Sequence, residues 1–307
     1  MAEHNLSPIV STEWLANHLD NPDVRIIDVR WKFREENGKG VGYDDHEGYQ
    51  EAHIPGAIFA RMVGDLSDPD HPIPDMMVQA EAFATVMGNL GVDNDTHIVV
   101  YDDSGIPLAA ARLWWALSYF GHDRVQVLDG GLLQWKLENR PISQETVEFL
   151  PTTFEPKVRP EWIAKKSDVM EALDDPRTVI VDCLPNELYR GDGEHTWGNR
   201  IGHVPGAVNV PAVANLDPVL AHTTMAERAE LLKMRGSFKL GTKDMLAEHY
   251  AENGIEPGGH AITYCGRGIA ASCGLLALKY IGIDNSRLYD GSWAEWSSDE
   301  DMPIEKS

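Results

Sequence analysis

The sequence predicts an α/β protein built from two similar domains, each a parallel sheet flanked by helices on both faces. Its 307 residues suit two domains of about 150 residues each. Short β-branched runs alternate with helix-forming stretches along the chain, a pattern typical of parallel strands joined by helices. The order of these elements also occurs twice, which indicates a duplication.

In the first half, the capping residue Ser11 predicts a short helix that ends at about Leu19. The elements expected after it are a strand over 24–30, a polar and glycine-rich loop over 35–48, a helix over 81–90, a strand over 96–101, a helix over 108–120, a strand over 125–128 and a last helix through Trp135.

The second half repeats this order about 150 residues later. Four pairs of motifs correspond, namely Trp14 with Trp162, 25–28 with 178–182, 53–57 with 203–207, and 127–135 with 288–296. We therefore predict an N-terminal domain over 1–145, a linker over 146–160 and a C-terminal domain over 161–307. The linker is proposed because four prolines within 140–160 interrupt any periodic pattern.

The second half also carries an extra segment, at about 216–243, that the first half lacks. It contains a predicted helix over 225–234 and several basic residues. Two interpretations are open: an exposed surface helix, or a lid or recognition element beside a functional site.

The charge balance is strongly acidic, with 49 acidic against 26 basic residues and a formal net charge of −23. Such a field repels nucleic acid and anionic membrane surfaces, so neither is expected as a partner. The sequence contains no run of about 18 apolar residues, so no membrane-spanning helix is expected. The cysteines Cys183, Cys265 and Cys273 form no CxxC pair, which disfavours a disulfide framework or a zinc site and favours a reducing cytoplasm.

The clearest chemistry lies around Cys265. The run Ile262–Tyr264 predicts a buried strand, and Gly266 and Gly268 then turn the chain into a helix-forming stretch. Backbone N–H groups converge in such a turn and the helix N-terminus adds positive potential, so the thiol should ionise easily and act as a nucleophile. Arg267 adds a positive charge to the same rim. The alternative, an inert buried cysteine, is disfavoured by the glycines and Arg267.

The run Cys265-Gly266-Arg267-Gly268-Ile269-Ala270-Ala271 resembles the persulfide loop of the rhodanese family in its tandem-domain sulfurtransferase form. The subclasses with the most similar motifs are the thiosulfate and 3-mercaptopyruvate sulfurtransferases. The resemblance implies a ping-pong reaction in which Cys265 takes sulfur from a small-molecule donor as a persulfide and passes it to cyanide or a thiol. It also implies a site at the domain interface. The first half holds Asp102 where the second holds Cys265, so the first domain should be catalytically silent.

The resemblance further implies which residues bind the donor: loop N–H groups would hold the anionic sulfur, and cations would hold the charged leaving group. The residues concerned are Gly266, Arg267, Gly268, Ile269, Ala270 and Ala271 in the loop, with Arg190 and Arg200 as further cations. Relatives usually carry an arginine two residues before Arg190, where this chain has Leu188.

The loop mixes features of both subclasses. Gly266 matches the mercaptopyruvate type, whereas Arg267 stands where the thiosulfate type has a lysine. Because a permanent cation suits the dianion thiosulfate, thiosulfate is the predicted donor and 3-mercaptopyruvate the alternative. A further alternative is a carrier that passes its persulfide to a protein, for example a thiol reductant.

A third class of function is disfavoured. Phosphatases that share the fold need an arginine six residues after the cysteine, where this chain has Ala271. No metal, nucleotide or flavin motif is present in the sequence, so we expect neither a metal site nor a cofactor.

Overall fold

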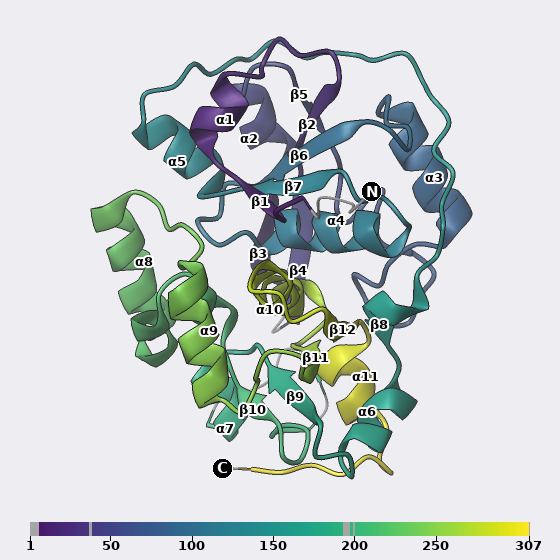
Figure 1. Cartoon of the computed structure of the whole chain (residues 1–307), viewed down its shortest axis with the longest axis vertical. Coiled ribbons are helices and arrows are strands. Elements are labelled where there is room, and N and C mark those ends of the chain that lie inside the picture. Colours follow the sequence, from purple (N-terminus) through teal and green to yellow (C-terminus); the bar gives the residue numbers. More distant parts are fainter. Residues whose placement is uncertain (1–5, 37–38, 193–196, 199, 307) are drawn as a thin grey trace.

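The computed structural model describes residues 6–36, 39–192, 197–198 and 200–306. It shows two α/β domains stacked along the long axis of the molecule, with the N-terminal domain above the C-terminal domain in Figure 1. The predicted fold class is confirmed. Two helices, α4 (Leu108–Tyr119) and α10 (Ile269–Tyr280), pack against each other where the domains meet.

Each domain contains a five-stranded parallel sheet. The strand order is β1-β7-β6-β2-β5 in the first domain and β10-β9-β11-β12-β8 in the second, which is the same topology. The bounds are β1 (Ile9–Val10), β2 (Val24–Asp28), β5 (Ala57–Phe59), β6 (His97–Tyr101), β7 (Val125–Leu128), β8 (Ile163–Ala164), β9 (Thr178–Asp182), β10 (Val208–Asn209), β11 (His260–Tyr264) and β12 (Asn285–Tyr289).

Helices cover both faces of each sheet. Besides α4 and α10, they are α1 (Thr12–Ala16), α2 (His46–Glu51), α3 (Ala80–Asn89), α5 (Gly131–Leu137), α6 (Lys166–Ala172), α7 (Asn186–Arg190), α8 (Met225–Arg235), α9 (Lys243–Glu252) and α11 (Ser292–Ser298), with short 3₁₀ turns at 160–162, 212–215 and 218–222. Successive residues of β2 point to opposite faces, so Ile26 packs on the side of α1 and α5 while Ile27 packs on the side of α3 and α4. Within the described residues, every helix is too short or too polar to cross a membrane.

The predicted loop over 35–48 is largely a β-hairpin, so this prediction was wrong. Strand β3 (Trp31–Glu36) pairs antiparallel with β4 (Lys39–Asp44), and α2 follows. The rings of Trp31 and Phe33 lie over Gly42 and Gly40 of the opposite strand, where a Cβ atom would collide with them. The aromatic rings supply the packing that the glycines lack, and the polar composition of the stretch concealed it. The hairpin extends from the first domain toward α10 (Figure 1).

The stretch 146–160 runs in an extended conformation along the first domain. The N–H of Thr152 donates to the carbonyl of Gly88 (2.9 Å), the N–H of Lys157 donates to that of Phe120 (2.8 Å), and Phe154 is buried. The stretch is therefore fixed to the domain that it leaves. The exact domain limits at 145 and 161 stay a prediction.

Candidate active site

Cys265 follows the last residue of the central strand β11 and precedes a glycine turn into α10. Gly268 has a φ of 79°, a left-handed conformation that favours glycine. Two hydrogen bonds connect the loop to helix α11. The N–H of Trp293 donates to the Cys265 carbonyl (2.9 Å), and the N–H of Cys265 donates to the Ser292 hydroxyl (3.2 Å). The strand, turn and helix predicted around Cys265 are all present.

The thiol of Cys265 lies inside a ring of backbone donors, but it is almost fully buried, at 2% exposure. Burial, with a smaller contribution from the Asp182 carboxylate, raises the pKa of the thiol, while the N–H groups of Ala271, Arg267 and Ala270 lower it. The net direction is upward. The expected cradle of N–H groups is therefore present, but the expectation of an easily ionised thiol does not hold in this closed arrangement, because desolvation outweighs the donors.

Arg267 is part of the loop but is not a free cation on its rim. Its side chain is buried, and its Nη1 lies 3.2 Å from the Asp75 carboxylate of the first domain. Its Nη2 is 3.5 Å from the carbonyl of Gly40 in the hairpin. The charge on which the prediction of thiosulfate rested is therefore countered by an acid from the other domain.

Aromatic residues cover the loop. The ring of Trp197 lies on Gly266, where an added Cβ would come within 2.8 Å of it. Phe33 of the hairpin is 5.9 Å from Trp197 and Trp31 is 5.9 Å from Phe33, measured between ring centroids. The sequence analysis did not predict the hairpin that brings Phe33 and Trp31 to this place. Its signal was the dipeptide Asn37-Gly38, a common hairpin turn sequence, between two alternating runs; those two residues themselves are outside the described part.

The two other predicted cations lie away from these contacts. The guanidinium of Arg200 donates to the backbone carbonyls of Trp296, Ser297, Asp299 and Met302 at the end of α11. Its donors are thus used in holding the C-terminal segment, which disagrees with the predicted role in substrate binding. Arg190 is about half exposed at the end of α7, with its Nε 3.4 Å from Asp192.

The first domain has the same loop with an acid in place of the thiol. Asp102 follows β6 as Cys265 follows β11, and its Oδ2 accepts from the N–H groups of Ala109 and Ala110, both at 3.1 Å. Burial raises the pKa of Asp102 to about 6. The N–H cradle of this loop is therefore occupied by the chain's own carboxylate, whereas the equivalent N–H groups around Cys265 face a thiol.

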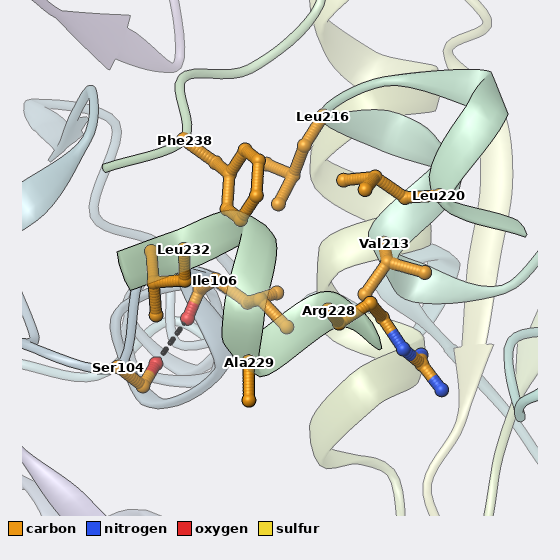
Figure 2. Close-up of a pocket in the computed structure, with 9 residues that line it drawn as sticks. All are labelled: Ser104, Ile106, Val213, Leu216, Leu220, Arg228, Ala229, Leu232 and Phe238. Carbon is orange, nitrogen blue, oxygen red and sulfur yellow. Dashed lines mark hydrogen bonds between the residues drawn. The ribbon is translucent and has the colours of Figure 1, made fainter. Parts of the chain in front are cut away.

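The extra segment of the second domain covers this acid-containing loop. Figure 2 shows α8 against Ser104 and Ile106, around an apolar cavity of about 180 Å³ that is also lined by Leu232 and Phe238. The guanidinium of Arg228 points away from these apolar walls, and its Nη2 is 3.9 Å from Glu187. Helix α8 thus contacts the first domain with one face while most of its described residues are exposed, and the cavity lining includes no residue of the Cys265 loop. Each loop is covered by an element of the opposite domain.

Comparison with known proteins supports this architecture. A family model described as a rhodanese-like domain matches residues 11–138 and again residues 165–299. The chain belongs to the rhodanese family. It carries two rhodanese-like domains in tandem, with Cys265 in the second.

Several curated relatives of this rhodanese are similar over most of their length. The 3-mercaptopyruvate sulfurtransferase of Escherichia coli K12 is 34% identical over 96% of this chain and 97% of its own. The mitochondrial thiosulfate/3-mercaptopyruvate sulfurtransferase 1 of Arabidopsis thaliana is 31% identical, over 97% and 78%. The sulfur carrier protein TtuD of Thermus thermophilus is 30% identical, over 97% and 96%.

Among solved structures, SseA of Escherichia coli, described in a study of 3-mercaptopyruvate sulfotransferases, superposes with a TM-score of 0.77 at 32% identity, over 94% of this chain and 99% of its own. The protein is a tandem-domain rhodanese sulfurtransferase. Both the predicted family and the predicted class of enzyme are confirmed.

Proposed function

We propose that this sulfurtransferase takes sulfur from 3-mercaptopyruvate through a persulfide on Cys265, with the loop Gly266–Ala271 as its anion cradle. The observation that carries the proposal is the ring of backbone N–H groups around the buried Cys265 thiol. Relatives named as 3-mercaptopyruvate sulfurtransferases, at 31 to 34% identity, support this donor.

The choice of donor reverses our expectation of thiosulfate. That expectation needed Arg267 as an uncompensated cation, whereas its guanidinium lies 3.2 Å from Asp75. A site in which the charge of Arg267 is balanced by Asp75 favours a donor with one carboxylate over a dianion. Thiosulfate remains a weaker donor in this proposal.

The reaction balances without a cofactor. Sγ of Cys265 forms a bond to the donor sulfur while the carbon–sulfur bond breaks, and its electron pair goes to the carbon that becomes the methyl group of pyruvate. The proton lost by the Cys265 thiol is matched by the proton gained at that carbon. Cyanide or a thiolate then attacks the outer sulfur, which releases thiocyanate or a new persulfide and regenerates the Cys265 thiolate. The N–H cradle stabilises the anionic sulfur in both steps.

A carrier role is the second candidate, because one relative at 30% identity is named as a sulfur carrier protein. In that case the acceptor would be a protein, such as a thiol reductant. The free state of Cys183, Cys265 and Cys273 suits the reducing cytoplasm that we propose as the compartment.

The test is steady-state formation of thiocyanate from cyanide, with 3-mercaptopyruvate or thiosulfate as the donor and pyruvate or sulfite as the respective second product. Wild type and Cys265→Ser are compared. We expect 3-mercaptopyruvate to be preferred and Cys265→Ser to lose turnover with both donors. Turnover that survives Cys265→Ser would contradict the proposal. Loading of one sulfur without turnover on cyanide would favour the carrier.

A further inference from the structure

Four charged side chains form a buried network between the Cys265 loop and the first domain. Arg267 and Asp290 come from the second domain, and Asp75 and Arg112 from the first. Their ion pairs are Arg267–Asp75 at 3.2 Å and Arg112–Asp290 at 2.6 Å. Two cations and two acids give the network no formal net charge.

The network touches the loop directly. A Cβ atom on Gly268 would lie 2.6 Å from Oδ1 of Asp290 and 2.8 Å from Nη1 of Arg112. The N–H of Met77 also donates to Oδ2 of Asp290 (3.3 Å). The charge of Arg112 in the first domain therefore lies next to the Gly268 turn of the Cys265 loop.

Asp75 is held in place by its own backbone. Its φ of 66° is uncommon for a residue other than glycine, and its side chain is only 4% exposed. Its carbonyl accepts a hydrogen bond from Nη2 of Arg112 (2.9 Å). Yet its Oδ2, the atom nearest Arg267, has no hydrogen bond of good geometry. The carboxylate is thus buried beside Arg267, with its charge facing the guanidinium.

We propose that Asp75 is a specificity-determining and positioning residue, which holds Arg267 beside the Cys265 loop and cancels its charge. A donor with one carboxylate is then accepted in preference to dianionic thiosulfate. The inference rests on the proposed function for its donor. The charge cancellation itself can be tested without any sulfur donor.

The physical reason is the charge of the incoming molecule. At a buried site with a free Arg267 a dianion gains about twice the Coulomb energy of a monoanion, and adding the Asp75 carboxylate removes this advantage. The first domain, although it lacks a nucleophile, would in this way set the donor preference of the second.

The decisive variant is Asp75→Asn, because asparagine has nearly the same size and tolerates a positive φ. We expect the ratio of kcat/KM for thiosulfate to that for 3-mercaptopyruvate to rise at least roughly tenfold. The matched control is Asp123→Asn, which breaks a different ion pair between an aspartate and an arginine, Asp123–Arg159, and leaves all four members of this network in place. Its ratio should stay near that of wild type.

A second measurement is independent of sulfur transfer. The rates at which anionic iodoacetate and neutral iodoacetamide alkylate Cys265 are followed by mass spectrometry of its peptide. A variant that merely loosens the fold speeds both reagents alike, whereas a freed Arg267 favours iodoacetate. We expect the iodoacetate-to-iodoacetamide ratio to rise in Asp75→Asn and to return toward wild type in Asp75→Asn/Arg267→Gln. Should Asp75→Asn fail to fold, Arg267→Gln alone leaves Asp75 unpaired and should lower the ratio.

The outcomes are distinct. An unchanged alkylation ratio in both Asp75→Asn and Arg267→Gln overturns the charge cancellation. A raised alkylation ratio with an unchanged donor preference overturns the role in specificity. If wild type uses neither donor, the proposed function fails, while the alkylation ratios still decide whether Asp75 cancels the charge of Arg267.

Discussion

Asp28 and Asp182 occupy the same place in the two domains, but only Asp28 has an arginine beside it. Asp28 is in register with Tyr101 on the neighbouring strand and Asp182 with Tyr264. Nη2 of Arg30 lies 2.5 Å from Asp28, whereas the second domain has Leu184 two residues after Asp182. Burial consequently raises the pKa of Asp182 to about 7. Among the described residues, the second domain thus holds a buried acid without a counter-ion behind Cys265.

This difference predicts opposite effects of one substitution at the two positions. Between about pH 4 and 7, Asp182 is protonated in the native state but ionised in the unfolded chain. Wild-type stability therefore falls as the pH rises through that window. Asp182→Asn should therefore stabilise the protein by about 1 to 4 kcal/mol at pH 8.5 and by less at pH 5.5. Asp28→Asn should destabilise it by about 3 to 5 kcal/mol, because Arg30 is left buried and unpaired. Urea unfolding at both pH values measures this, and a shift of the same sign in both variants at pH 8.5 would contradict it.

The same acid should control the thiol. Because the Asp182 charge raises the pKa of Cys265, Asp182→Asn should lower the pH at which Cys265 reaches half its maximal rate of alkylation by iodoacetamide. The profile is measured between pH 6 and 10 on the Cys265 peptide. Asp284→Asn, an exposed acid of the same domain, is the control and should leave the profile unchanged. An identical midpoint in Asp182→Asn and wild type would argue against the coupling.

Gly268 should tolerate no side chain. Gly268→Ala and Gly258→Ala both place alanine at a φ near 80°, but only Gly268 has atoms where the Cβ would lie. Each variant should lose about 1 kcal/mol from the backbone conformation, and Gly268→Ala a further 1 to 3 kcal/mol or so from the collision with Arg112 and Asp290. Chemical denaturation of the two variants checks this. Equal losses would mean that the network moves aside freely.

Trp197 should limit access to Cys265, since its ring lies on Gly266. Removing the ring in Trp197→Ala should speed alkylation of Cys265 by neutral iodoacetamide roughly tenfold, because less of the structure must open. Trp14→Ala is the control, as Trp14 stacks on His18 in the other domain (3.9 Å). If both variants react at the wild-type rate, another element closes the site.

Alanine variants of Arg200 and Arg190 should distinguish a role in stability from a role in substrate binding. Arg200→Ala removes four hydrogen bonds to the end of α11 and should cost about 2 to 4 kcal/mol of unfolding free energy. Arg190→Ala breaks only a half-exposed ion pair and should change stability by less than about 0.5 kcal/mol. Unfolding curves and the donor KM are measured together. A higher KM in Arg200→Ala at unchanged stability would restore its predicted substrate role.

The sequence by itself determined the tandem α/β architecture, the duplication and the loop around Cys265. These features depend on local patterns: short β-branched runs such as β2 that alternate with helices, glycines where a turn needs a positive φ, and an acid at the position of the thiol in the first half. Such patterns act over a few residues and can be read directly. The hairpin 31–44 was missed because its packing comes from rings lying on the glycines of the opposite strand.

Only the tertiary structure decided the electrostatics of the site. Whether Arg267 acts as a free cation depends on Asp75, which is distant in the sequence and lies on the other domain. The direction of the Cys265 pKa likewise depends on the burial of the thiol and on the Asp182 carboxylate. Charges interact strongly only where folding brings them together in a region from which water is excluded, so the chemistry of this loop is set by neighbours that the loop sequence does not contain.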